Sequence, residues 1–386
     1  SSRAVPDGLP VAVAVPITTA QVAAALSWAN KHHIPVAVRG AGSGLSGGAM
    51  SYEGGLTISL LGFTQIEVDP TNLLATVGAG VITADLDRAA SLHGLMYAPD
   101  PVSSELSTIG GNIATNAGGP RCLAYGVTAD AVVALETVLA DGRVIRSGSR
   151  TVKNSSGLNL TSIFVGSEGT LGVITEATVR LRPRPTGPRQ CFSASFHTLD
   201  DAGQAIIAIL SELPRPETLE LMDANTLAVV EQHFPGEKKL PGVASIVGEY
   251  VGEQAEDLAS TIIALCARYG AETMIGSSAE SLLRTRLRVN PALNAAGLTA
   301  SCDVAVPISE IGKMLQQIDQ LSRRFGLQVH AFAHAGDGNF HPAVVVPHED
   351  PAALATAEHL LDAITHAALE LGGVISGEHG IGSLKR

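Results

Sequence analysis

The chain has 386 residues, with 25 Lys and Arg against 37 Asp and Glu and a formal net charge of −12. Because 45% of the residues are hydrophobic and only 16% are charged, the composition excludes a disordered chain, and the acidic balance argues against a nucleic-acid partner. At roughly 150 residues per domain, the length predicts two domains or three. The 41 glycines follow no fixed period, which excludes a collagen-like protein.

Membrane spans and cysteine-based sites are also not expected. No stretch supplies the roughly 18 uninterrupted apolar residues of a membrane-spanning helix. The four cysteines lie far apart and form no C-x-x-C pair, which argues against iron–sulfur, zinc–thiolate and disulfide-framework proteins. We expect a cytoplasmic protein, with peripheral attachment to a membrane left open. Since the chain opens with Ser rather than Met, the presence of a leader is also left open.

The first half of the chain is expected to contain short strands and two helices. A β-branched run over residues 11–15 predicts a strand, and Thr18 or Thr19 is expected to cap a helix over residues 21–32. Further strands are expected at residues 36–38, 56–59, 66–68, 74–77, 135–139 and 144–146, with a second helix over residues 82–93. Asp141 and Gly142 predict a hairpin between the last two strands.

The second half follows a Pro- and Gly-rich linker at residues 183–188 and has longer elements. The expected strands are residues 192–196, 218–222, 245–251, 303–306 and 328–334, and the expected helices are residues 201–213, 253–269 and 309–325, with one more beginning near residue 350. These patterns predict an α+β protein whose two domains divide near residue 188.

Three glycine-rich segments stand out in the first half. Residues 42–47 match G-x-G-x-x-G after a strand, but the glycines that follow, up to residue 55, leave no room for the helix that a Rossmann fold requires. This segment is either a phosphate-binding backbone loop or a surface loop with tight turns. Residues 107–119, rich in Gly, Thr and Asn, and residues 166–176 are the other two. Together they predict a cofactor of dinucleotide size, approached closely by the backbone.

Residues 38–48, 99–101, 109–119 and 165–176 resemble the FAD-linked D-2-hydroxyacid dehydrogenases. This family includes D-lactate dehydrogenase, the glycolate oxidase flavin subunit and D-2-hydroxyglutarate dehydrogenase. The resemblance covers essentially the whole chain. It implies a vanillyl-alcohol-oxidase-type (PCMH-type) FAD-binding domain over residues 1–187 and a ferredoxin-like α+β substrate or cap domain over residues 188–350. An incomplete C-terminal segment, residues 351–386, is expected to return toward the FAD.

The resemblance also implies which residues bind FAD. They are Arg39, Gly40, Ala41, Gly42, Ser43, Gly44, Leu45, Pro99, Asp100, Thr108, Gly110, Gly111, Asn112, Thr115, Asn116, Gly118, Glu168, Gly169, Gly172 and Ile174. Some members of the wider superfamily attach the flavin covalently through a His in the first loop. Because residues 39–48 contain neither His nor Cys, we expect non-covalent FAD.

Histidines gather near the end of the chain, where residues 330–386 hold seven of the 12. Asp337 and Gly338 predict a two-residue hairpin turn that would place His334 directly opposite His341, with Cβ atoms roughly 4.5–5.5 Å apart. Two neutral imidazoles at that separation suit a divalent metal. A pair of half-buried, hydrogen-bonded histidines at a tight turn is the structural alternative.

A third metal ligand is expected from the glycine-rich residues 376–382. The resemblance implies that His334, His341 and Glu378 bind the metal and that His379 is the catalytic base in contact with substrate. Zinc, manganese and iron all accept such a ligand set. His330, which lies on the same face of the predicted strand as His334, is the alternative ligand. The remaining histidines, His348, His359 and His366, are expected to have no role.

The substrate carboxylate is expected to bind an arginine, since Arg can hold it with two hydrogen bonds. The resemblance points to Arg286, while Arg284 and Arg288 are equally well explained as surface residues of a helix. Positions that we align with the distal-carboxylate site of the hydroxyglutarate branch, Asn290, Ser301 and Ala343, lack its Lys and Asn. A short monocarboxylate, D-lactate or glycolate, is therefore favoured.

These residues together predict oxidation of a D-2-hydroxy acid. The metal would lower the pKa of the substrate hydroxyl, His379 would take its proton, and the flavin would accept a hydride at N5. The electrons would pass to a quinone, a cytochrome, an electron-transfer flavoprotein or a partner subunit, because no NAD site is recognisable. Three alternatives stay open: a D-2-hydroxyglutarate dehydrogenase, a flavin subunit that is inactive alone, and a metal-dependent hydrolase of a nucleotide.

Overall fold

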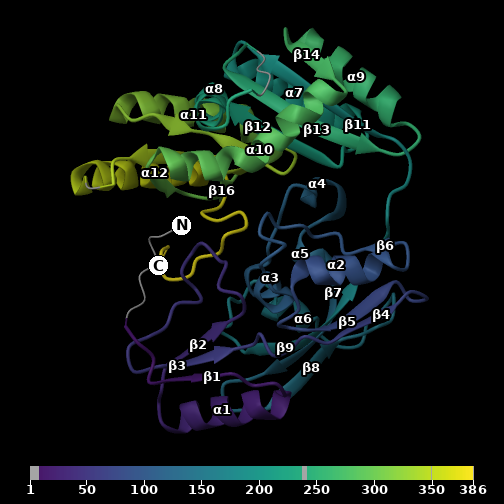
Figure 1. The fold of residues 1–386 in the computed structure, drawn as a ribbon, viewed down its shortest axis with the longest axis vertical. Helices are drawn as coiled ribbons and strands as arrows, with labels where there is room; N and C mark the ends of the chain where they lie inside the picture. Colours follow the sequence, from purple (N-terminus) through teal and green to yellow (C-terminus); the bar gives the residue numbers. More distant parts are fainter. Residues whose placement is uncertain (1–7, 237–240, 349, 386) are drawn as a thin grey trace. The chain divides into compact units, whose positions relative to one another are not determined.

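The computed structural model describes residues 8–236, 241–348 and 350–385. It consists of two compact units, and each is considered by itself (Figure 1). Unit 1 contains the chain up to Arg184 together with the C-terminal segment from Glu378, and unit 2 contains Pro185–Gly377. The predicted domain limits at residues 187 and 350 stay a prediction; in the structure, residues 351–377 belong to unit 2.

A small parallel sheet in unit 1 begins the fold. It has the order β1 (Ala12–Ala14), β3 (Leu56–Ser59) and β2 (Val36–Arg39). Helix α1 (Thr19–Lys31) begins where Thr18 and Gln21 form a reciprocal capping box, so Thr18 is the predicted cap. Its buried residues, Val22, Leu26 and Ala29, share a core with Leu56 and Ile58 of the sheet. The amphipathic spacing thus holds this helix against the parallel sheet.

The second sheet of unit 1 is antiparallel and has five strands. Their order is β4 (Ile66–Asp69), β5 (Leu74–Gly78), β9 (Val173–Arg180), β7 (Val132–Val138) and β8 (Val144–Gly148). The predicted β7–β8 hairpin is confirmed, with Gly142 at a φ of 89° in its turn.

The remaining elements of unit 1 are α2 (Thr83–Ser91), β6 (Leu95–Met96), α3 (Ile109–Thr115), α4 (Cys122–Tyr125), α5 (Thr128–Ala131), α6 (Thr161–Phe164) and β10 (Arg182–Pro183).

Unit 2 is built on a seven-stranded sheet. Its order is β14 (Glu272–Ile275), β11 (Arg189–Phe196), β13 (Ala244–Val251), β12 (Thr218–Asp223), β18 (Phe332–His334), β19 (Asn339–Phe340) and β16 (Val304–Ala305), and the strand pairs are antiparallel. A smaller sheet has the order β15 (Leu298–Ser301), β20 (Ala343–Val346) and β17 (Val329–His330). The ferredoxin-like description of this part stays a prediction.

Helices cover the sheets of unit 2 (Figure 1). They are α7 (Leu199–Glu212), α8 (Ala224–His233), α9 (Ala255–Arg268), α10 (Ser277–Ala296), α11 (Ile311–Phe325) and α12 (Pro351–Glu370), with a short 3₁₀ turn at Ile308–Glu310. Strand β12 is buried along nearly its whole length, which places its side chains inside the unit.

One predicted strand of unit 2 is wrong. Residues 328–334 form two strands rather than one, because the chain leaves the smaller sheet after β17 and enters the seven-stranded sheet at β18. His330 pairs with Ala343 in the first sheet, and His334 pairs with Glu220 in the second. The period-2 argument that put His330 and His334 on one strand face therefore does not apply.

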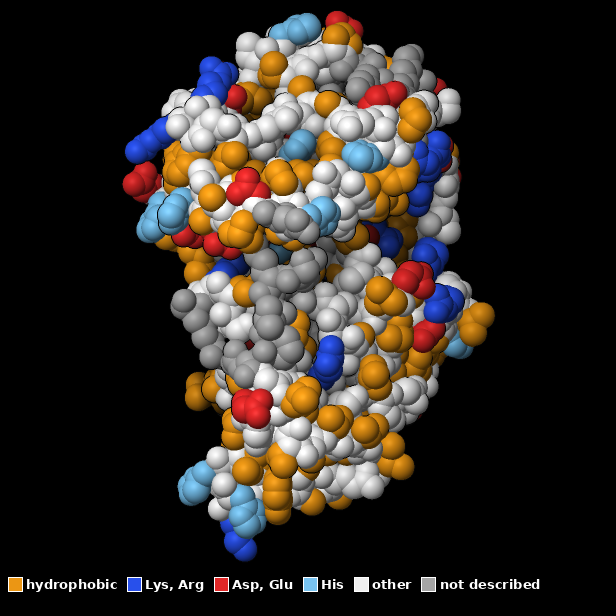
Figure 2. Space-filling view, turned by 60° about the vertical axis from the view of Figure 1, so that its left-hand side comes forward, with side chains coloured by type: hydrophobic (Ala, Val, Ile, Leu, Met, Phe, Trp, Pro, Cys, Tyr) orange, Lys and Arg blue, Asp and Glu red, His pale blue; other side chains and the backbone are white. Residues whose placement is uncertain are grey.

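The surface carries both signs of charge. On the face seen in Figure 2, Lys and Arg side chains are scattered among Asp and Glu rather than gathered into one continuous basic patch. Across the described ranges, none of the helices combines the length and the apolar character needed to cross a membrane.

Candidate active site

The three glycine-rich segments meet at a cavity inside unit 1. Its walls come from all three segments, since they include Gly40 of the first, Thr108 and Gly110 of the second, and Gly169 and Gly172 of the third. A Cβ atom at Gly40 would lie 2.2 Å from Thr108 Oγ1, so only the bare backbone fits there. The segments are therefore packed together rather than spread over the surface.

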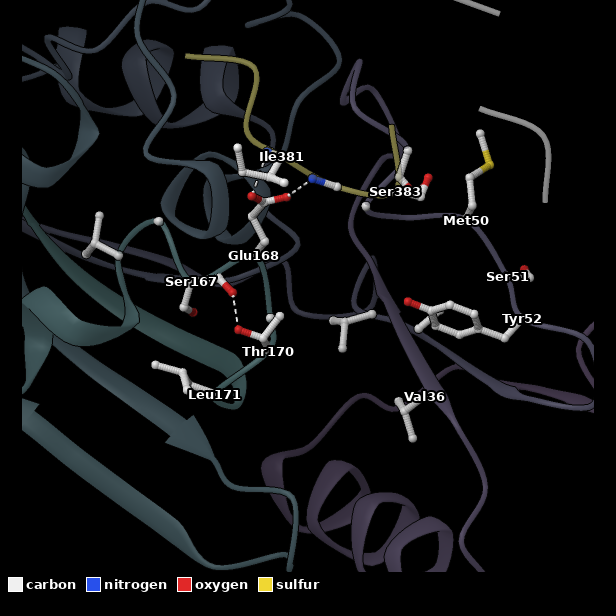
Figure 3. A pocket seen from close by; sticks show the side chains of 18 of the residues that line it. Val36, Met50, Ser51, Tyr52, Ser167, Glu168, Thr170, Leu171, Ile381 and Ser383 are labelled. Carbon is white, nitrogen blue, oxygen red and sulfur yellow. Dashed lines mark hydrogen bonds between the residues drawn. The ribbon is translucent and has the colours of Figure 1, made fainter. Parts of the chain in front are cut away.

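A larger pocket of about 480 Å³ adjoins this cavity and shares Val38, Glu168 and Gly169 with it (Figure 3). Met50 and Tyr52 line one side, and the turn at residues 166–171 lines another. The volume falls in the range of small-molecule sites, and the lining mixes apolar side chains with backbone polar groups. Both pockets lie entirely within unit 1.

The first glycine-rich segment is a loop. No helix or strand occurs between Gly40 and Gly55, in agreement with the rejection of a Rossmann fold. Arg39 ends β2, and the exposed loop residues that follow include Ala41, Gly42, Gly44 and Leu45, with Ser43 half-buried. Gly42 has a φ of 72°, a conformation that glycine adopts at little cost.

The second glycine-rich segment forms helix α3. Thr108 caps its first turn by accepting a hydrogen bond from Gly111 N, and Asn116 ends it in a left-handed conformation with a φ of 52°. Asn112 is buried and donates from Nδ2 to Thr83 Oγ1 at 2.7 Å. The other predicted residues here lie in the same helix, namely Gly110, Gly111 and Thr115.

The predicted residues around this helix are held by short polar contacts. Asp100, next to the buried Pro99, accepts hydrogen bonds from Arg121 N and Nε. Gly118 is buried where a Cβ atom would lie 2.8 Å from Glu378 Oε2, within unit 1. The remaining predicted residues, Gly169, Gly172 and Ile174, follow Glu168 into β9.

Glu168 links the third glycine-rich segment to the C-terminal segment. Its two carboxylate oxygens accept hydrogen bonds from Ile381 N at 2.8 Å and Gly382 N at 2.7 Å, as Figure 3 shows. Glu168 adopts a φ of 51°, unusual for a residue with a side chain. Ser46 Oγ donates to the carbonyl oxygens of His379 and Gly380. Glycine-segment side chains thus anchor the backbone that carries His379.

The two predicted metal-binding histidines of unit 2 are buried neighbours. The ring centroids of His334 and His341 are 5.1 Å apart, with the planes at 85°. The predicted register is wrong, because His334 pairs with Asn339 and the turn has four residues instead of two. His341 instead lies beside Phe332, donating from its backbone N to Phe332 O, and so is diagonal to His334 on the same face.

A buried carboxylate that the sequence analysis did not select joins these residues. Glu220 of β12 lies directly opposite His334 of β18, and its Oε1 is 2.7 Å from His334 Nδ1. Its Oε2 accepts a hydrogen bond from Arg286 Nε at 2.8 Å. Only 1% of the Glu220 side chain and 8% of the Arg286 side chain are exposed. Arg286 also lies over the Phe332 ring, 4.7 Å from its centroid.

The charges around Glu220 keep it ionised. Burial raises the pKa of a carboxyl group, but the nearby His334 and Arg286 outweigh this, and the pKa of Glu220 lies below its usual value. His341 has its own carboxylate neighbour, since Asp303 Oδ1 is 3.7 Å from its Nδ1. Ser376 Oγ donates to the other oxygen of Asp303.

The other arginines and histidines weighed in the sequence analysis, among them His330 as the alternative metal ligand, lie elsewhere in unit 2. Arg284 forms a surface ion pair with Glu280, whereas Arg288 lies over the ring of Phe234. His348, His359 and His366 are exposed, and His330 is buried in the smaller sheet.

Comparison with known families now identifies this architecture. Residues 10–148 match the family described as "FAD binding domain", and residues 188–386 match "FAD linked oxidases, C-terminal domain". The chain belongs to the FAD-linked oxidases. It is thus an oxidoreductase with an FAD-binding domain, and the sequence-based family assignment is confirmed.

Two curated relatives and one solved structure illustrate the relationship. This FAD-linked oxidase is 38% identical to glycolate oxidase subunit GlcD of Bacillus subtilis (strain 168), over 98% of its own length and 82% of the relative. It is also 38% identical to a D-lactate dehydrogenase of Archaeoglobus fulgidus, over 97% and 83% respectively. The crystal structure of p-cresol methylhydroxylase with substrate bound shares its two-domain PCMH-type fold, with a TM-score of 0.76, 17% identity and coverage of 97% and 82%.

The cavity and the adjoining pocket are lined by the glycine-rich segments and lie in unit 1, where residues 10–148 match the FAD-binding domain. Gly40 and Gly110 both line this cavity, and they pack so closely against Thr108 and Ala79 that neither position has room for a side chain. Glu220 carried a sequence signal that the prediction did not use: it is a charged residue with Leu219, Leu221 and Met222 as its neighbours in β12. Arg286, which the sequence analysis did select, is also a buried charge, because it occupies the buried stripe of α10 with Leu282, Val289 and Leu293. Buried charges are rarely retained without a partner or a function.

Proposed function

We propose that this FAD-linked oxidase oxidises a short D-2-hydroxy acid, D-lactate or glycolate, to the corresponding 2-oxo acid. The observation that carries the proposal is the buried cluster of His334, His341 and Arg286 in unit 2, gathered around Glu220. The cluster holds the residue types needed to bind a hydroxy carboxylate. The names of the relatives, a glycolate oxidase subunit and a D-lactate dehydrogenase, support the same substrate class.

Each group of the proposed site has a separate role in the reaction. FAD, bound without a covalent link, would accept the hydride from the substrate carbon. The guanidinium of Arg286 would hold the substrate carboxylate, since its Nε is already engaged by Glu220 and its two terminal nitrogens remain suitable for a carboxylate. A ring nitrogen of His379 would take the proton of the substrate hydroxyl. Such proton transfer contributes about 10²–10⁴-fold to a rate.

A divalent metal, zinc, manganese or iron, would lower the pKa of the substrate hydroxyl. The proposed ligands are His334, His341 and Glu378. Two features of unit 2 fit a metal: the imidazoles are buried neighbours, and the first has a carboxylate behind its ring. Glu378 lies two positions after Ser376 in the chain. Ser376 donates a hydrogen bond to Asp303, which lies beside His341.

His379→Asn tests the central step. The variant is expected to keep its FAD, because the backbone of residue 379 and not its ring bonds to Ser46, while flavin reduction by D-lactate slows about 10²-fold or more. Anaerobic stopped-flow absorbance measures the bleaching, and flavin release on denaturation measures the FAD content. His359→Asn, on an exposed face of α12, is the matched control. Unchanged bleaching would remove His379 from this role.

A panel of D-2-hydroxy acids scored by the same bleaching tests the substrate. Lactate or glycolate is expected to reduce the flavin fastest, whereas a preference for D-2-hydroxyglutarate would favour that branch of the family. Bleaching without any added partner would exclude a flavin subunit that is inactive alone. A purified protein without flavin would exclude the whole proposal and leave the nucleotide hydrolase.

A further inference from the structure

Glu220 is a buried carboxylate that contacts two residues of the proposed site, yet it is not one of the proposed metal ligands. It bridges His334 and Arg286, the proposed metal ligand and the proposed carboxylate-binding residue, through one oxygen each. The bridge crosses three elements, β12, β18 and α10, whose positions are fixed by strand pairing and core packing. A buried charge is costly unless it is fully paired, and Glu220 is paired through both of its oxygens.

The bridge determines which nitrogen of His334 carries a proton. An ionised carboxylate can only accept hydrogen bonds, so a neutral His334 must place its hydrogen on Nδ1 to satisfy the 2.7 Å contact. Its Nε2 then presents a lone pair, the form that binds a metal. Arg286 Nε likewise can only donate, and so it occupies the second oxygen of Glu220.

We propose that Glu220 is a positioning residue: it holds His334 in the tautomer that ligates the metal and fixes the Arg286 side chain for the substrate carboxylate. The inference rests on the proposed function, because it concerns the proposed metal and carboxylate sites. Carboxylates behind metal-binding imidazoles orient the ring and raise its basicity, and their loss typically weakens metal binding 10–100-fold. His341 offers a contrast, since its Asp303 contact of 3.7 Å is too long for a direct hydrogen bond.

Glu220→Gln provides the sharpest test, because Arg286 dictates how the new amide lies. The amide oxygen must face the Arg286 N–H, which leaves the amide NH₂ facing His334 Nδ1. Nδ1 must then accept, and the ring proton moves to Nε2, where it blocks the metal. The variant keeps the shape of the side chain, so a lost methylene or cavity does not confuse the result.

The first measurement is metal affinity, by titration of metal-stripped FAD-containing protein with Zn²⁺ and with Mn²⁺. Glu220→Gln is expected to bind at least about 10-fold more weakly than the unaltered protein. Glu249→Gln is the matched control. Glu249 is a buried carboxylate of the adjacent strand β13 and pairs with Arg189, so this variant should bind the metal as tightly as the unaltered protein. Equal affinity in Glu220→Gln and the unaltered protein would overturn the inference. Absence of metal binding in the unaltered protein would instead overturn the metal site of the proposed function, and the inference with it.

The second measurement needs no stable variant. In ¹⁵N-histidine NMR of the metal-free protein, with His334 identified from a His334→Asn sample, the proton is expected on Nδ1. A proton on Nε2 would overturn the inference even if Glu220→Gln failed to fold. In a folded Glu220→Gln sample, the proton is expected on Nε2 of the same ring, and retention on Nδ1 would count against the proposal.

Discussion

The two units hold different kinds of candidate groups. Unit 1 offers backbone: glycine-rich segments pack so closely that a Cβ atom at Gly40 or Gly110 would clash. Unit 2 offers buried charge: Glu220, Arg286 and the histidine pair lie among apolar side chains. Neutral backbone groups cost less to desolvate than charged side chains, so buried charges are the more expensive of the two.

This difference implies that substitutions in unit 2 should affect folding and chemistry together. The largest effect is expected for Arg286→Ala, which leaves the ionised Glu220 buried without its ion-pair partner. Breaking a buried ion pair costs about 3–5 kcal/mol of unfolding free energy. Substrate binding should be lost as well. Denaturant unfolding of unit 2 and flavin bleaching as a function of D-lactate concentration measure the two effects.

The control for Arg286→Ala lies on the same helix. Arg284 forms an exposed pair with Glu280, so Arg284→Ala should change stability by only about 0–1 kcal/mol. The double change Glu220→Met with Arg286→Met removes both buried charges and should restore part of the stability lost in Arg286→Ala. If the double variant is the least stable of the set, the description of unit 2 as a costly charge cluster is wrong.

In unit 1 a smaller and more local effect is expected, because Glu168 anchors backbone rather than charge. Glu168→Ala removes the acceptor of Ile381 N and Gly382 N, so residues 378–385 should exchange their amide hydrogens about 10-fold faster or more. Hydrogen–deuterium exchange with mass spectrometry measures this by peptide. Flavin reduction should slow through a lower kcat, since this segment carries His379.

Glu53→Ala is the matched control for Glu168→Ala. Glu53 also anchors a terminal segment of unit 1, by accepting a hydrogen bond from Leu9 N. Its loss should speed exchange near residue 9 and leave residues 378–385 unchanged. Faster exchange of residues 378–385 in both variants would mean that unit 1 loosens as a whole, and that Glu168 has no specific link to the C-terminal segment.

The same contrast explains what the sequence could predict. Local signals gave the capped helix α1, the β7–β8 hairpin and the three glycine-rich segments, because each depends on residues close together in the chain. The glycine-rich segment at residues 107–119 was expected to approach a ligand as backbone, but its helix α3 was missed, since two glycines disfavour a helix that Thr108 caps.

The parts that escaped prediction depend on contacts distant in sequence. Glu220 lies 114 positions from His334, and only the pairing of β12 with β18 brings them together. The turn after His334 was misjudged because Asp337 and Gly338 suit a two-residue hairpin, whereas the strand pairing selects a four-residue turn. The histidines nevertheless remained neighbours, because a shift of two in the register keeps both side chains on the same face.

Asp223, three residues after Glu220, shows that a carboxylate in unit 2 need not belong to the site. It caps helix α8 by accepting a hydrogen bond from Thr226 N, and burial raises its pKa from 3.8 to about 6. Because the folded protein binds this proton more tightly than the unfolded chain, stability should fall as pH rises from about 4 to 6 and then stay level. Asp223→Asn keeps the cap and removes the charge.

The Asp223→Asn variant should therefore match the unaltered protein below about pH 4 and exceed its unfolding free energy above pH 6, by about 1–3 kcal/mol. Urea unfolding at pH 4, 6 and 8 measures this, with flavin bleaching unchanged. For Glu220 the partners Arg286 and His334 reverse the direction of the pKa shift that burial alone would cause. Glu220→Gln should accordingly lose stability at neutral pH, where Asp223→Asn gains it. A gain of stability in both Glu220→Gln and Asp223→Asn would mean that Arg286 and His334 do not compensate the cost of burying the Glu220 charge. Glu220 and Asp223 would then not differ in the way proposed.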